Sequence, residues 1–314
     1  MKTTWPRGGL SRRAWLRRMA GAALLLTAGA RPAPGAEPLP IVGKRIPASA
    51  ELVPAIGMGT WITFHVGNDR WQRDRRVAVL QRFFERGGTL VDSSPMYGSA
   101  EAVMGYCLER TRGVERVFAA TKVWTYGRTR GIEEMQTSRR LWGVPRFDLM
   151  QVHNLVDWQT HLETLKAWKG EGKLRYIGVT TSHGRRHEEL ARILAREPLD
   201  FVQLSYNVLD REAEQRLLPL AAERGIAVIA NRPFRTGGLF RYVRGKPLPS
   251  WAGEIGCGNW AQFFLKFIIS HPAVTCAIPA TSQLAHMEEN MGALREPLPD
   301  AHQRQRMVRY LESI

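Results

Sequence analysis

The chain has 314 residues, enough for one large α/β domain or two ordinary ones, and its 44% hydrophobic and 24% charged residues are typical of a globular protein. Its formal net charge of +16 raises the question of nucleic-acid binding, but seven of the positive charges stand before residue 37. The sequence contains no DNA- or RNA-binding motif, so we expect no nucleic-acid partner. The three cysteines, at positions 107, 257 and 276, form neither a metal-binding nor a disulfide pattern.

The first 36 residues have the layout of an export signal. The pair Arg12-Arg13 precedes Trp15-Leu16, and an apolar run follows over residues 20–30, which is too short to span a bilayer. This stretch resembles a twin-arginine signal, with candidate cleavage sites after Ala30 and Ala36. The resemblance implies the twin-arginine export machinery as a partner, a periplasmic location and no stable membrane insertion. The alternative is a disordered basic tail.

Beyond a Pro/Ala/Gly-rich linker at 31–50, which leads into a short hairpin, apolar β-rich runs alternate with helical stretches. Helices are predicted over 74–88, from Ser99 onward, and over 158–171, 210–225 and 260–271. The predicted strands cover 55–61, 89–93, 116–124, 147–154, 174–181, 200–207, 226–231 and 274–279.

Eight such units are the count of a (β/α)8 TIM barrel, because nearly continuous apolar strands indicate a parallel sheet that is buried on both faces. We assign residues 1–36 to the signal and linker and 37–314 to the barrel, and we expect a monomer. A doubly wound open sheet is the alternative, but Gly57-Met58-Gly59 lacks the third glycine and the following helix of a phosphate-binding loop.

Four polar residues stand where consecutive predicted strands end. Asp92 ends the second strand and Tyr97 follows it in the loop, while Lys122 and His153 end the third and fourth strands. The carboxyl ends of barrel strands form one rim, where catalytic residues are placed. Each residue taken singly has a structural explanation, such as a helix cap or a satisfied core histidine. Four of them on consecutive units favour a shared site.

These side chains suit proton transfer to a carbonyl oxygen. A phenol has a pKa of about 10, and a nearby ammonium such as Lys122 is expected to lower the pKa of Tyr97. Asp92 would hold that ammonium in place, and His153 would orient the carbonyl oxygen. Because neither a nucleophile nor a metal-ligand set accompanies them, the hydride must come from a cofactor.

Several segments resemble the aldo-keto reductases in order and spacing over roughly residues 40–295: GTLVDSSPMYGSAE, AATKVW, FDLMQVHN, GKLRYIGVTT, FVQLSYNVLDREAEQRLLPLAAERGIAVIA and IPATSQLAHMEENMGAL. The resemblance implies a TIM barrel that binds a nicotinamide cofactor, usually NADPH, without a Rossmann fold. It also implies that Asp92, Tyr97, Lys122 and His153 are the catalytic tetrad, with Tyr97 as general acid and base.

The resemblance assigns cofactor contacts as well, and several of these positions depart from the family pattern. The family's Ser-Asn pair is Thr180-Thr181 here, and its stacking aromatic is Asn231. The two cations that bind the 2′-phosphate of NADPH are replaced by Ala280 and His286. The loss of these cations should weaken discrimination for the phosphate. We expect NADPH as the cofactor, and NADH, another cofactor or none are the alternatives. The expected cofactor-binding residues are Thr180, Thr181, Gln203, Asn231, Arg232, Thr281, Ser282, His286, Glu289 and Asn290.

The sequence thus predicts an exported oxidoreductase that reduces an aldehyde or ketone with a nicotinamide cofactor. The alternative is a low-turnover cofactor-binding or sensing protein on the same scaffold. A metal site at His183 and His187, four residues apart, is disfavoured because no convergent ligands accompany them, and we expect the stretch to begin a helix.

Overall fold

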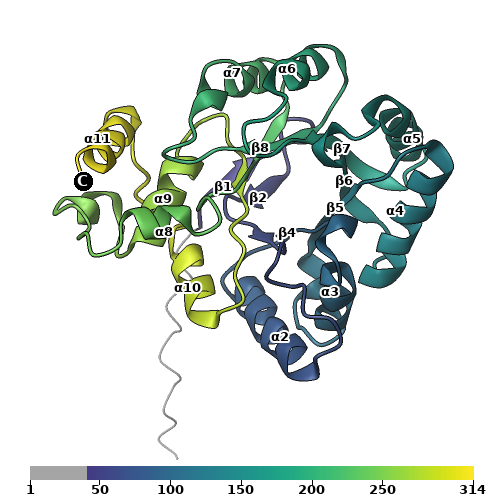
Figure 1. Ribbon diagram of the computed structural model, residues 1–314, viewed down its shortest axis with the longest axis horizontal. Coiled ribbons are helices and arrows are strands. Elements are labelled where there is room, and N and C mark those ends of the chain that lie inside the picture. Colours follow the sequence, from purple (N-terminus) through teal and green to yellow (C-terminus); the bar gives the residue numbers. More distant parts are fainter. Residues whose placement is uncertain (1–40) are drawn as a thin grey trace, which may run out of the picture. The chain divides into compact units, whose positions relative to one another are not determined.

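The computed structural model describes residues 41–314, and its centre is a ring of eight parallel strands (Figure 1). Each strand pairs with its neighbour in chain order, and parallel bridges from Ile56 to Ala277 and from Gly59 to Ala280 join the last strand to the first. The predicted barrel is confirmed, with a strand inside each of the eight predicted segments. The strands are β3 (Met58–Gly59), β4 (Leu90–Asp92), β5 (Phe118–Val123), β6 (Phe147–Val152), β7 (Leu174–Thr180), β8 (Phe201–Ser205), β9 (Ala227–Asn231) and β10 (Cys276–Ala277).

Helices surround the strands (Figure 1). The helices are α2 (Arg70–Glu85), α3 (Ala100–Leu108), α4 (Arg128–Trp142), α5 (Trp158–Gly170), α6 (His187–Arg196), α7 (Leu217–Glu223), α8 (Gly238–Tyr242), α9 (Trp260–Ile269), α10 (Leu284–Gly292) and α11 (Ala301–Glu312). The chain from 41 to 314 contains no helix with both the length and the apolar character that a membrane crossing requires. The predicted export signal and the boundary after residue 36 lie outside the described residues.

The helix predicted over 210–225 is wrong as a single element. The structure has a 3-10 turn at Glu212–Glu214 and then the separate helix α7, which begins at Leu217. Pro219 lies in the first turn of α7, where its missing N–H is tolerated. A continuous helix would have placed the Pro219 ring against the carbonyl of residue 215, so the helix restarts just before the proline.

A short hairpin covers the amino-terminal end of the barrel. It consists of β1 (Gly43–Arg45) paired antiparallel with β2 (Leu52–Pro54), as expected after the linker. Ile46 and Val53 belong to the same buried cluster as Leu90 and Phe118, which begin barrel strands. Because this end is filled by apolar side chains, the carboxyl ends of the strands are the end at which a site can form.

Candidate active site

The four residues predicted to form the catalytic tetrad lie together at the carboxyl end of the barrel. The Lys122 Nζ is 2.5 Å from the Asp92 Oδ2 and 5.2 Å from the centre of the Tyr97 ring. The rings of Tyr97 and His153 meet edge to face, with centroids 5.7 Å apart. β4 and β5 supply Asp92 and Lys122. His153 is the first residue of the 3-10 turn His153–Leu155 that follows β6, and the 3-10 turn Pro95–Tyr97 supplies the phenol.

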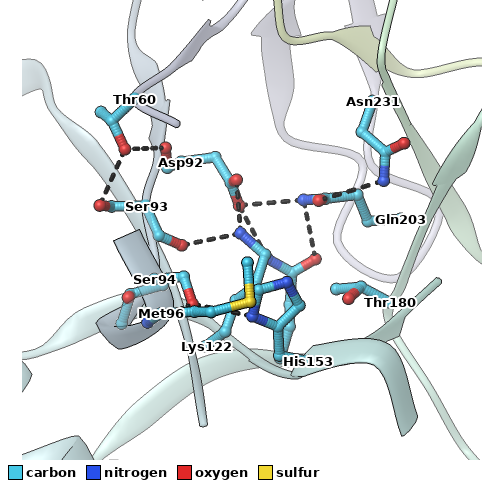
Figure 2. Close-up of polar contacts among 12 residues, drawn as sticks. Thr60, Asp92, Ser93, Ser94, Met96, Lys122, His153, Thr180, Gln203 and Asn231 are labelled. Atoms are coloured by element: carbon cyan, nitrogen blue, oxygen red, sulfur yellow. Dashed lines mark hydrogen bonds and ion pairs between the residues drawn. The ribbon is translucent and has the colours of Figure 1, made fainter. Parts of the chain in front are cut away.

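A network of hydrogen bonds fixes the Asp92 carboxylate (Figure 2). The Asp92 Oδ1 accepts hydrogen bonds from the Nε2 of Gln151 at 3.0 Å and of Gln203 at 2.9 Å. Its other oxygen accepts from Lys122, which also donates to the Ser93 carbonyl at 2.7 Å. Burial by itself lowers the pKa of Lys122, but Asp92 and Tyr97 more than offset it, so the net pKa is raised and the amine stays charged.

The prediction that the Lys122 ammonium lowers the pKa of Tyr97 below its ordinary value is wrong. Burial of the phenol raises its pKa, and this effect exceeds the opposing influence of the Lys122 ammonium. Asp92 neutralises much of that ammonium and itself favours the protonated phenol. Tyr97 is therefore protonated at neutral pH and is a proton donor in the resting site.

His153 is held as a neutral imidazole. Burial, and then the nearby Lys122, lower its pKa to about 2. Its Nδ1 is 2.8 Å from the Ser94 Oγ, and that oxygen already accepts a hydrogen bond from the Met96 N–H at 3.2 Å. The Ser94 hydroxyl hydrogen is free to be donated to Nδ1, and in that arrangement the His153 proton lies on Nε2.

Gln151 and Ser94 were missed by the sequence reasoning. A signal for Gln151 was present, because side chains alternate along a strand and residues 149, 151 and 153 of one strand share a face. Ser94 follows Asp92 by two residues in a stretch that contained another serine, and nothing in its spacing distinguished it from a turn residue.

The tetrad opens into a cavity of about 320 Å³ at the barrel rim. Of the ten non-glycine residues with left-handed backbone in the described chain, five line this cavity: Ile62, Asn154, His183, Arg232 and Thr236. Strained backbone of this kind gathers at functional sites. The cavity is therefore the candidate active site.

Five of the residues predicted to bind the cofactor line this cavity, namely Thr180, Thr181, Gln203, Asn231 and Arg232. The Asn231 Nδ2 donates to the Thr181 carbonyl at 2.9 Å, and its Oδ1 accepts from the Ser205 hydroxyl at 2.7 Å. The Thr181 Oγ1 is buried and has no hydrogen-bond partner among the described residues. An unpaired buried hydroxyl beside two amides is a place for a polar ligand group.

The other five, Thr281, Ser282, His286, Glu289 and Asn290, lie beyond the end of β10, where Ala280 still lines the cavity and residues 281–290 do not. The Thr281 hydroxyl is engaged locally with the backbone of Gln283. His286 is exposed and Asn290 is buried, both on α10. These five residues thus do not line the tetrad cavity itself.

Arg232 is a cationic residue in the wall of the tetrad cavity. Its guanidinium donates to the Nε2 of His183 at 2.6 Å and to Thr236 at 3.2 Å. Desolvation and the charge of Arg232 lower the pKa of His183, which keeps that imidazole neutral as an acceptor. α6 begins at His187, as predicted, and no group of three potential metal ligands occurs in the described part of the chain.

Comparison with known proteins places this barrel and its site. A model of the aldo/keto reductase family matches residues 55–306. Methylglyoxal reductase YeaE of Escherichia coli (strain K12) is 31% identical over 262 residues, which cover 79% of this chain and 88% of the relative. An aldo/keto reductase from Klebsiella pneumoniae, solved in complex with NADP and acetate, has a TM-score of 0.71 at 27% identity and covers 83% of this chain and 93% of its own.

A second structure from Klebsiella pneumoniae, in complex with NADPH, also has a TM-score of 0.71 at 27% identity, with coverage of 86% of this chain and 96% of that one. The barrel carries a carboxylate, an amine, a phenol and an imidazole on one rim. This set of groups is typical of an enzyme that transfers a proton to or from a small molecule. The chain belongs to the aldo/keto reductase family, whose members are nicotinamide-dependent carbonyl reductases.

Proposed function

We propose that this protein reduces an aldehyde or ketone, with Tyr97 as the general acid. The observation that carries the proposal is the edge-to-face contact of Tyr97 with His153 beside the buried Lys122–Asp92 pair. When bound, a nicotinamide cofactor supplies the hydride. The protonated phenol then gives its proton to the oxygen of the reduced carbonyl.

The supporting residues have separate roles. The Nε2–H of His153 donates a hydrogen bond to the carbonyl oxygen and orients it toward Tyr97, while its neutral state avoids a second charge beside Lys122. The Lys122 ammonium stabilises the phenolate that forms when Tyr97 loses its proton. Asp92 holds Lys122 at 2.5 Å and is itself fixed by two glutamines, so the geometry is set before substrate binds.

The residues present fit the nicotinamide end of the cofactor. The Gln203 amide and the unpaired Thr181 hydroxyl are candidates to hold its carboxamide. Asn231 cannot stack as an aromatic does, so we propose recognition by hydrogen bonds at this position. NADPH is the proposed cofactor because the Klebsiella pneumoniae relatives were solved with NADP and NADPH.

The test is a comparison of the purified protein with its Tyr97→Phe variant. We expect turnover of a small aldehyde to fall by about 10²- to 10⁴-fold, the contribution of a general acid. Cofactor affinity, followed by tryptophan fluorescence with NADPH and with NADH, should remain within about twofold because the phenol hydroxyl acts on the substrate oxygen. Full activity in the variant would contradict the role of Tyr97, and no quenching of the parent by either cofactor would contradict the proposed function. Quenching of the parent without turnover would favour the cofactor-binding alternative.

We propose in addition that the protein is exported by the twin-arginine route to the periplasm. The proposal is supported by Arg12-Arg13, followed by Trp15-Leu16 and the apolar run over residues 20–30. Replacement of both arginines by lysine should leave the protein in the cytoplasm, measured by cell fractionation and immunoblotting. Equal periplasmic amounts of the parent and the double variant would refute it.

A further inference from the structure

The connection between β3 and α2 holds a branched apolar residue in left-handed backbone at the mouth of the active-site cavity. Ile62 has φ of 62° and lines the cavity, and 58% of its surface is exposed. A β-branched residue with positive φ is a genuine outlier, because its side chain crowds the backbone in this conformation. Glycine would adopt the same backbone at lower cost.

The turn that contains Ile62 is anchored at both ends by buried residues. The Thr60 hydroxyl lies 3.0 Å from the Asp92 carbonyl and 2.8 Å from the Ser93 Oγ, and it is buried. Phe64 is fully buried, and its N–H donates to the Thr60 carbonyl at 3.1 Å. The chain turns over the three residues between them, and Ile62, in the middle of the turn, has left-handed backbone.

The other left-handed residues around the cavity are polar and use their side chains. Asn154 and His183 are hydrogen-bonded to Ser182, and Arg232 donates to Thr236. The Ile62 side chain has no polar atom with which to offset its strained backbone. Its exposure also means that burial in the fold returns little stability. Stability therefore does not explain an isoleucine at this position.

We propose that Ile62 determines substrate specificity by contacting the apolar substituent of the carbonyl compound, and that the preferred substrates carry an aryl or branched alkyl group. The cavity wall supports this class, because Trp61, Met96 and Phe234 also line it. A substrate that covers Ile62 buries the apolar surface that the fold leaves exposed to water. The hydrophobic free energy of that burial then contributes to substrate binding. This inference rests on the proposed carbonyl reduction.

The kinetic test compares benzaldehyde with acetaldehyde, which share the reacting group and differ in the substituent. In Ile62→Gly we expect the ratio of kcat/KM for benzaldehyde to that for acetaldehyde to fall about tenfold, a size typical of one lost apolar contact. Ile62→Val keeps most of the side chain and should keep the ratio within about threefold of the parent. Ala50→Gly is the matched control, because Ala50 has φ of 60° in the exposed hairpin turn, away from the cavity.

Thermal denaturation separates this role from a structural one. Ile62→Gly should have a melting temperature equal to or above that of the parent, since glycine relieves the left-handed strain. A decrease of more than about 3 °C would show that Ile62 stabilises the fold and would overturn the inference. An unchanged benzaldehyde-to-acetaldehyde ratio in Ile62→Gly would overturn it as well.

Equilibrium binding of benzamide, an unreactive analogue of benzaldehyde, makes the inference testable without turnover. The Kd of benzamide, measured by isothermal titration calorimetry, should be about tenfold higher for Ile62→Gly than for the parent. If the parent binds benzamide more tightly than Ile62→Gly does but reduces no aldehyde, the proposed function fails while the contact with Ile62 stands. Equal benzamide affinity in the two proteins, or no binding by the parent, would refute the contact itself.

Discussion

The buried pair of Lys122 and Asp92 allows the structural and chemical roles of the site to be measured separately. The two residues are 0% and 1% exposed, and Nζ and Oδ2 are 2.5 Å apart. Asp92→Asn keeps an oxygen that can accept from Gln151 and Gln203, so the change removes mainly the charge. The Lys122 ammonium would then be buried with the Ser93 carbonyl as its remaining partner.

The expected cost follows from that uncompensated charge. Removing one member of a buried ion pair costs about 3–5 kcal/mol. For a domain of this size such a loss corresponds to a decrease in melting temperature of about 10 °C. Urea denaturation followed by tryptophan fluorescence measures the free energy of unfolding, and an aldehyde-reduction assay on the same samples measures turnover.

The control is the double variant Asp92→Asn/Lys122→Met, which has no buried charge at either position. We expect it to recover at least half of the lost stability while its turnover stays at background, because the neutral pair packs well but cannot stabilise a Tyr97 phenolate. A single variant as stable as the parent would refute the reasoning, as would a double variant less stable than the single one.

Three further predictions follow from the same geometry. The rate of turnover should be independent of pH between about pH 5 and 9, because the pKa of His153 is about 2 and the pKa of Tyr97 is raised. The rate should fall only at higher pH, where Tyr97 loses its proton. A change in rate with a midpoint near pH 6.5 would contradict this prediction. Ser94→Ala should lower kcat about tenfold with cofactor affinity unchanged, and Ser94→Thr should restore it; equal kcat in Ser94→Ala would remove the proposed control of the His153 tautomer. Gly105→Ala should lower the free energy of unfolding by about 1–3 kcal/mol, since its Cβ would lie 1.9 Å from the Leu141 carbonyl oxygen; an unaffected urea midpoint would show that α3 and α4 can separate without cost.

The strands and the tetrad were predictable from sequence because they follow from local patterns. Continuous apolar runs separated by helical stretches indicate buried parallel strands, and the carboxyl ends of such strands share one rim. Asp92, Lys122 and His153 end consecutive runs, so their convergence required only the strand count. The break at Pro219 was also readable locally, although the helix was predicted to continue through it.

The protonation states, the supporting contacts and the extent of the cavity were decided by the tertiary structure. The sequence predicts that Lys122 is near Tyr97. The sign of the Tyr97 pKa shift, however, depends on how completely the fold removes water from the phenol. Ala280 lines the cavity and His286, on α10, does not, which the sequence could not decide. Ile62 reads as an ordinary loop residue in the sequence. Its left-handed backbone is seen only in the fold, in a turn between the buried residues Thr60 and Phe64, and burial is a property of the whole fold.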